Sequence, residues 1–229
     1  MHHCLKRAAW AALGLFCALD AAAEPMLRLK TGPALLDFRT HSADLMGPPG
    51  STPPGVKADV RDARTLGLVA ERDLDACWSA VLQLGVPPRV RFDGAGAGAA
   101  LGEVGRARAW FPAVLLGWRP PAWGAVQPYA AFGAHLTWFD NTEASPAYSA
   151  AFGGASSRAA LKPSVGPVFK LGAELPLGEP WLMDVSLARY RIATTATLRT
   201  QTPGVGEVLR SLDVRVDADV LSLMLGYRF

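Results

Sequence analysis

The sequence of 229 residues contains little cysteine, little histidine and no long uninterrupted apolar run after its first residues. Of the three cysteines, Cys4 and Cys17 precede the expected start of the mature chain, so Cys77 has no partner for an intramolecular disulfide. A membrane-spanning helix needs roughly 20 apolar residues, and no later stretch reaches that length without glycine, proline or charge. The sequence therefore excludes a disulfide scaffold and disfavours a helical membrane protein.

Charge of one sign is also scarce. The formal net charge is +3. Removal of a leader that contains Lys6, Arg7 and Asp20 would lower it to +2. Such a balance gives no field to attract nucleic acid. The glycine-rich residues 94–98 lack the Lys-Ser/Thr that follows a phosphate-binding loop, and no metal-ligand spacing is present. We therefore expect no nucleic-acid partner, no metal and no cofactor.

The first residues have the three parts of a secretory signal. Lys6 and Arg7 give a positive start, residues 8–19 form a short apolar run, and three alanines follow as a cleavage site. The sequence therefore predicts a signal peptide over residues 1–23, which is removed, and a single domain over residues 24–229.

Period-two hydrophobicity, which is typical of strands with one face toward lipid, recurs about eight times in the mature chain. It is clearest at the end, where one face carries Leu221, Leu223, Leu225, Tyr227 and Phe229, and the other carries Ser222, Met224, Gly226 and Arg228. The other segments span residues 26–36, 65–71, 78–84, 110–118, 127–138, 165–175 and 181–198. Because an open sheet edge is unstable in lipid, the strands must close. The sequence predicts an all-β fold, a transmembrane antiparallel eight-stranded up-and-down β-barrel.

The connections between these segments alternate in length. Short ones fall near residues 72–75, 120–125 and 178–180, and long ones cover 38–64, 88–105, 140–164 and 201–207. Since the long ones are rich in glycine, proline, serine and alanine, we expect mobile loops there. Tryptophans and tyrosines near strand ends indicate interfacial girdles, although they are also compatible with the core of a soluble sandwich.

Several motifs resemble those of the OmpW family of small outer-membrane proteins. They are Gly226–Phe229, Val214–Asp217, Thr194–Thr197, Pro128-Tyr129 with Gly133, and Phe139-Asp140-Asn141. Ala131 departs from the glycine that is common in the family. The resemblance implies location in the outer membrane of a Gram-negative bacterium. It also implies a narrow, partly apolar lumen that takes small hydrophobic molecules from outside and releases them sideways into the membrane.

Three groups of residues are candidates for specific roles. Ligand passage is assigned to Tyr129, His135, Val168 and Met224 in the inward rows, and a salt-linked plug below them to Arg28, Lys30, Lys170, Glu174 and Asp184. All of these residues could instead fill a solid core. Leu223, Leu225, Tyr227 and Phe229 resemble the signal that the outer-membrane assembly machinery recognises, or simply form an apolar last strand. The expected partners are outer-membrane lipids, this machinery and a small hydrophobic ligand.

Catalysis is not expected, but one alternative stays open. His135 and Thr137 share a strand face, and a carboxylate from Glu174 or Asp184 would complete an arrangement similar to that of barrel lipid hydrolases. In a further alternative, the barrel is a passive anchor or receptor that acts through its external loops.

Overall fold

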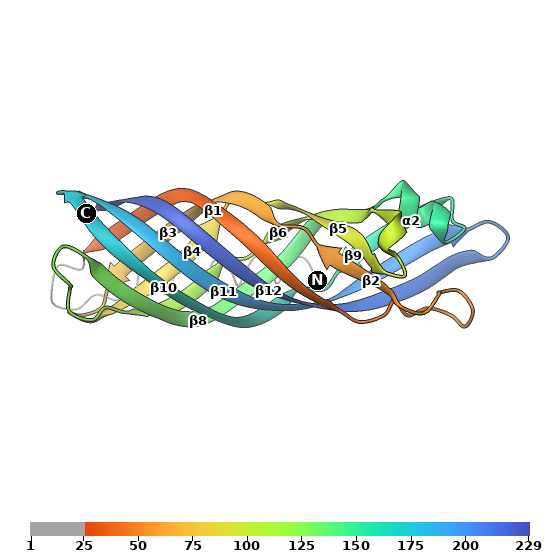
Figure 1. Ribbon diagram of the computed structural model, residues 1–229, viewed down its shortest axis with the longest axis horizontal. Coiled ribbons are helices and arrows are strands. Elements are labelled where there is room, and N and C mark those ends of the chain that lie inside the picture. The colour runs from red at the N-terminus through yellow and green to blue at the C-terminus, as the bar shows by residue number, and fades with distance from the viewer. Residues whose placement is uncertain (1–25) are drawn as a thin grey trace.

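The computed structural model describes residues 26–229, so the expected signal peptide lies outside the described residues. Long antiparallel strands make up most of the molecule (Figure 1). The strands are β1 (Leu27–Ser42), β2 (Val56–Val60), β3 (Ala63–Asp73), β4 (Trp78–Gly85), β5 (Arg89–Gly96), β6 (Glu103–Trp110), β7 (Ala113–Trp118), β8 (Gln127–Ala144), β9 (Ser156–Leu161), β10 (Ser164–Gly178), β11 (Trp181–Thr202) and β12 (Gly206–Arg228). A short 3-10 helix, η1 (Ala99–Leu101), and one α-helix, α2 (Pro146–Ala151), lie between them.

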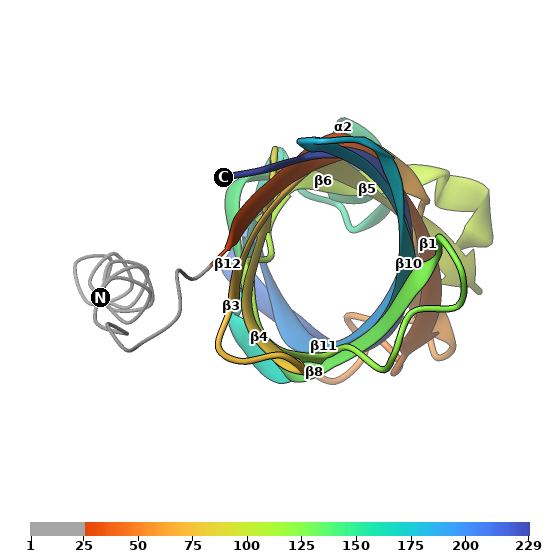
Figure 2. The ribbon, with the colours of Figure 1, turned by 90° about the vertical axis from the view of Figure 1, so that its left-hand side faces the viewer.

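Eight of the strands close into a ring. In the order β1, β3, β4, β7, β8, β10, β11 and β12, each pairs antiparallel with the next, and β12 pairs with β1. Figure 2 looks along the barrel and shows the ring of ribbons. Because ring order equals chain order, this is an up-and-down barrel without a free edge in the membrane. The prediction of an all-β, eight-stranded barrel is confirmed.

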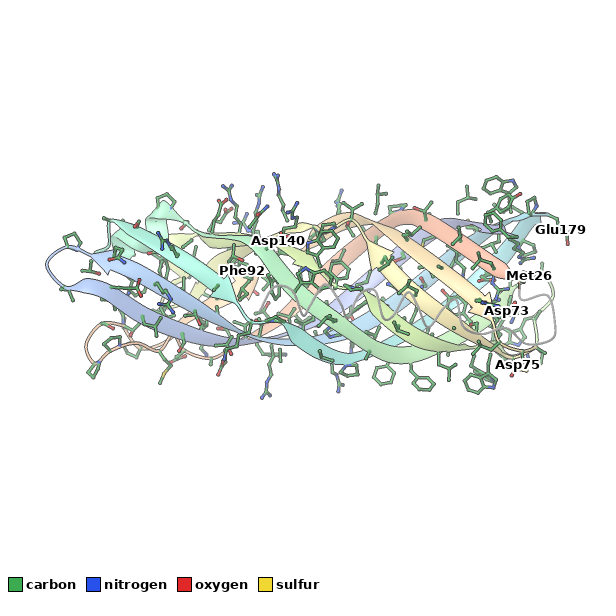
Figure 3. The ribbon with its side chains drawn as sticks, turned by 180° about the vertical axis from the view of Figure 1, so that it is seen from behind. Met26, Asp73, Asp75, Phe92, Asp140 and Glu179 are labelled. Carbon is green, nitrogen blue, oxygen red and sulfur yellow. The ribbon has the colours of Figure 1, made fainter. Side chains whose placement is uncertain are left out.

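The two ends of the barrel differ. The described termini and the short connections lie at one end, the turn end, where Met26, Asp73, Asp75 and Glu179 gather in Figure 3. The opposite end, the loop end, carries β2, β5, β9 and α2 (Figure 1). In outer-membrane barrels short turns face the periplasm and longer loops face outward.

A belt of exposed apolar side chains surrounds the ring. Its members face outward from alternate strand positions and include Leu29, Leu35, Leu66, Leu68, Val114, Phe132, Val165, Phe169, Leu171, Val185, Leu187, Leu221, Leu223 and Leu225. Toward the turn end the belt finishes in Trp78, paired with Trp118, and Trp181, packed edge-on against Tyr227. Such rings prefer a membrane interface, so they form one girdle. In the described part of the chain no helix is long and apolar enough to cross a membrane.

Toward the loop end the belt gives way to charge. Arg189 donates to Asp219 at 2.6 Å, and each lies two positions closer to the loop end than the belt residue on its strand, Leu187 on β11 and Leu221 on β12. Trp110 and Trp138 stack with ring centroids 5.7 Å apart on the same outer surface. Charged residues at a lipid-facing position are unfavourable, so the barrel beyond this level stands outside the hydrocarbon.

The predicted long loops are largely wrong. Residues 38–64, 88–105 and 140–164 contain β2, β5, β9, the start of β6 and the ends of β1 and β8, and the 201–207 connection reduces to a turn at residues 203–205. The composition of these segments suggested loops, but their side chains alternate between buried and exposed positions as strands do. The strand expected over 110–118 is also two strands, β6 and β7, because Pro112 has no N–H to continue the ladder.

Candidate ligand cavity and the barrier below it

Buried charged side chains cross the lumen near the turn end. This ion cluster consists of Arg28, Lys30, Glu71, Arg119, Glu174 and Asp184. Lys30 Nζ lies 2.9 Å from Glu71 Oε2 and 3.0 Å from Asp184 Oδ2, and it also pairs with Glu174. Arg119 Nη2 donates to both Glu71 and Glu174 at 2.7 Å. Charges this buried are stabilised only when they are paired, so the cluster is a linked unit.

The sequence anticipated part of this cluster. Arg28, Lys30, Glu174 and Asp184 are joined as expected, but Lys170 stands over the Tyr129 ring, 5.7 Å from its centroid, with no ion pair in the described chain. Glu71 and Arg119 were missed. Glu71 is the last residue of the predicted strand over residues 65–71, so its inward direction could have been inferred from the hydrophobic alternation there. Arg119 lies just after β7, where no alternation indicates the direction of a side chain.

A packed apolar layer lies next to the ion cluster. Val69, Val168, Tyr190 and Met224 have almost no exposed surface and belong to one cluster of buried residues. Tyr129 reaches toward the turn end, where its hydroxyl donates to Asp184 Oδ2 at 2.8 Å. Of the residues assigned to ligand passage, Val168 and Met224 thus lie within the packed layer, and Tyr129 contacts the ion cluster.

His135 occupies a separate position. Its Nε2 is 2.8 Å from the Arg191 carbonyl oxygen, and its Nδ1 is 2.9 Å from Thr137 Oγ1. The expected carboxylates are engaged elsewhere, since Glu174 and Asp184 both bind Lys30. Within residues 26–229, the histidine–threonine pair therefore lacks both of the carboxylates that were expected to complete a hydrolase triad. Residues 26–229 also contain no group of three potential metal ligands among His, Cys, Asp and Glu.

An apolar cavity of about 110 Å³ lies inside the loop-end half of the barrel. Its lining is mostly aliphatic and aromatic and includes Phe38, Leu45, Val56, Val60, Val90, Phe92, Phe111, Phe139, Tyr148, Ile192, Leu198, Leu212, Val214 and Val216. A dry cavity of roughly 150 Å³ holds benzene, so this one suits a small apolar group. Many of its walls come from segments expected to be loops, which is why sequence reasoning did not locate it.

A second apolar depression interrupts the wall of the barrel. This lateral hollow lies where β4 ends at Gly85 and where β6 and β7 separate at Pro112. Its other lining residues include Leu66, Leu84, Val86, Trp110, His135, Leu136 and Val165. Ala109 and Phe111 line both the hollow and the cavity, and the Phe111 ring packs edge-on against Tyr190 with centroids 5.9 Å apart. Phe111 therefore stands between the interior and the lipid-facing wall.

Ion pairs brace the wall at the loop-end margin of the belt. Arg108 donates to Asp140 through Nε at 2.6 Å and Nη2 at 3.2 Å, and Trp110 donates to the same carboxylate at 3.0 Å. The hydrogen bonds from Arg108 lower the pKa of Asp140 below its ordinary value. Asp140 projects from the outer wall about halfway along the barrel in Figure 3. These contacts tie β6 to β8 beside the lateral hollow.

The closed ring, the apolar belt and the aromatic girdle define an integral outer-membrane β-barrel. The chain belongs to the OmpW family, whose model matches residues 27–229. It is an outer-membrane protein of a Gram-negative bacterium, as the sequence predicted.

Individual relatives agree with this assignment. The chain is 29% identical over 150 residues to outer membrane protein AlkL of Ectopseudomonas oleovorans, a match that spans 64% of this chain and 57% of AlkL. The crystal structure of OprG from Pseudomonas aeruginosa superposes with a TM-score of 0.77 at 25% identity and covers 90% of this chain and 96% of OprG. The solution structure of outer membrane protein W from Escherichia coli gives a TM-score of 0.55 at 20% identity, covering 91% and 100% of the two chains.

Proposed function

We propose that this barrel is a non-enzymatic channel that takes small hydrophobic molecules from outside into the apolar cavity and releases them sideways into the membrane. The observation that carries the proposal is the shared wall between cavity and lateral hollow, made by Ala109 and Phe111. Phe111 is the larger of the two side chains, so we infer that movement of its ring opens the connection between the two spaces.

The energetics favour a sideways exit over passage along the axis. An apolar molecule gains about 25 cal/mol for each Å² of surface that leaves water for the cavity. Further movement toward the turn end would require opening the packed layer and separating Lys30 and Arg119 from their carboxylates, and buried ion pairs are costly to break. Through the hollow, by contrast, the molecule meets Leu66 and Val165, which are exposed on the lipid-facing wall.

The residues first assigned to passage divide between two roles in this proposal. His135 lines the lateral hollow and remains on the path. Tyr129, Val168 and Met224 form the floor that prevents passage to the periplasm. The membrane lipids are the acceptor of the released molecule.

Substitution of Phe111 by tryptophan tests the proposal. The larger ring should narrow the connection between cavity and hollow and lower the initial uptake rate severalfold. Uptake is measured with the fluorescent hydrophobic probe N-phenylnaphthylamine in Gram-negative cells that express the protein, relative to cells without it. Phe132→Trp is the matched control, because Phe132 is exposed on the outer face of β8. Heat-modifiable gel migration reports equal amounts of folded barrel.

Each outcome bears on the proposal. A reduced rate in Phe111→Trp and an unchanged rate in Phe132→Trp supports lateral release. Equal rates in cells with and without the wild-type protein would reject a transport role and favour an anchor or receptor that acts through the loop end.

A further inference from the structure

Arg210 is a buried cation with no anionic partner among residues 26–229. It lies on β12 in the inward row and is only 3% exposed. Its Nη2 donates to the Ser51 carbonyl oxygen at 3.1 Å, but Nε and Nη1 have no hydrogen-bond partner in the described part of the chain. None of the ion pairs formed within residues 26–229 includes Arg210. Burying a charge in this way is unfavourable unless something pairs with it.

The surroundings of Arg210 connect it to the apolar cavity. Leu212 is the next inward residue of β12, Leu198 is directly opposite Arg210 on β11, and both line the cavity. The guanidinium lies 4.6 Å from the ring centroid of Phe152, the C-cap residue that follows α2. Residues 47–52 contact its other side through Gly47 and Ser51. The arginine is thus covered toward the loop end and adjoins the cavity below.

A second polar group lies beside it. Tyr148 on α2 is buried and lines the cavity, and its hydroxyl lies near Thr200 and Arg210 but makes no hydrogen bond of normal geometry within residues 26–229. Burial raises the pKa of Tyr148, and the nearby charge of Arg210 acts in the opposite direction. The phenol stays protonated at neutral pH, so it can donate a hydrogen bond. Two donors of different chemistry therefore adjoin one apolar cavity.

We propose that the cavity selects amphiphiles with a carboxylate head, which accepts hydrogen bonds from Arg210 and Tyr148 while the aliphatic tail lies among Leu198, Leu212 and Val214. Guanidinium–carboxylate hydrogen bonds are charge-assisted and short, and Arg is suited to such buried recognition. This inference rests on the proposed function, because it names the substrate class of the same cavity. The arginine makes the site distinguish a carboxylate from an alcohol of equal length.

The test compares butanoate with butan-1-ol, which share one chain length and differ in the head, and whose short chains suit a cavity of about 110 Å³. Binding is followed by NMR titration of the protein in lipid nanodiscs, through the amide signals of Leu198 and Leu212. The wild-type protein should bind butanoate at least tenfold more tightly than butanol. In Arg210→Gln this preference should disappear, because butanoate affinity falls while butanol affinity is retained. Arg210→Lys, which keeps the positive charge, should retain part of the preference.

Arg215→Gln is the matched control, because Arg215 is an exposed, outward-facing arginine on the same strand, and it should leave the preference unchanged. Equal binding of the two probes by the wild-type protein, or a preference that survives in Arg210→Gln, would overturn the inference alone. If neither probe binds the wild-type protein, the inference and the proposed function both fail. Equal binding of the two probes by the wild-type protein overturns the inference whether or not the variants fold, and Arg210→Lys tests the guanidinium if Arg210→Gln does not fold.

Discussion

At the scale of single residues, the interior depends on pairing between charges that are far apart in the chain. Lys30 faces three carboxylates, those of Glu71, Glu174 and Asp184, from three other strands. Removal of the ammonium group would leave these anions mutually repelling in a site with almost no access to water. Lys30 therefore contributes more to stability than its single charge suggests.

We expect Lys30→Met to lower the free energy of unfolding by about 3–5 kcal/mol, the usual cost of breaking a buried ion pair from one side. Equilibrium urea unfolding of the refolded barrel in lipid vesicles measures this change. Lys57→Met is the control, because Lys57 is exposed and lies 3.8 Å from Asp44, and exposed pairs contribute little. Equal effects of the two substitutions would contradict the ion cluster.

At the scale of elements, the ring strands are much longer than a membrane crossing requires. A transmembrane strand needs about 9–11 residues, whereas β12 has 23 and β11 has 22. The surplus lies at the loop end, where outward positions carry charge and inward positions form the cavity. The same strand thus meets lipid over one part of its length and water over another.

This division predicts that one substitution has different effects along β12. Leu223 and Leu209 are outward-facing and about equally exposed, at 50% and 49%, but only Leu223 lies in the apolar belt. Leu223→Arg should destabilise the barrel by about 2–4 kcal/mol, as an arginine near the bilayer midplane does, and Leu209→Arg should have little effect. Urea unfolding in vesicles tests both, and similar losses would mean that the belt extends to Leu209.

The eight ring strands were predictable from the sequence because the side-chain direction in a strand alternates with every residue. Each strand that crosses the apolar belt therefore shows an alternation of apolar with polar or small residues in its own sequence. The loop-end strands were not. In the segment of β5, for example, Gly94 and Gly96 interrupt the alternation of apolar and polar side chains, and the glycine-rich composition suggested a loop. Pairing with β2 and β6 holds this segment extended, and a partner in another part of the chain is not visible in a local pattern.

At the scale of the whole molecule, closure depends on the meeting of the two chain ends. β1 and β12 pair from Arg28 with Arg228 to Ser42 with Val214. Phe229 N donates to the Leu27 carbonyl oxygen at 2.9 Å, and its ring packs against Tyr227. Leu223, Leu225, Tyr227 and Phe229 occupy one outward row, and we propose that the assembly machinery recognises this row before the barrel closes.

Deletion of Phe229 should reduce the fraction of heat-modifiable barrel in the outer membrane severalfold, because an outward aromatic end is lost before assembly. Phe229→Tyr, which keeps the ring, should assemble normally. Gel migration of outer-membrane fractions before and after boiling measures both. Refolding of the purified chain in vesicles separates recognition from stability, since the deletion should refold there as well as the wild type. Normal assembly in cells without Phe229 would contradict the proposed signal.

The sequence by itself determined the number of ring strands and their inward and outward faces, because these follow from the alternation of side chains within each segment. It also determined the family, because the family is recognised by short motifs. Only the tertiary structure decided which inward residues meet. Closure of the ring brings Lys30, Glu71 and Glu174 to one level, leaves Arg210 beside an apolar cavity without an anion, and puts Phe111 between that cavity and the lipid-facing wall. Strand register sets these levels, and register belongs to pairs of strands rather than to any one segment.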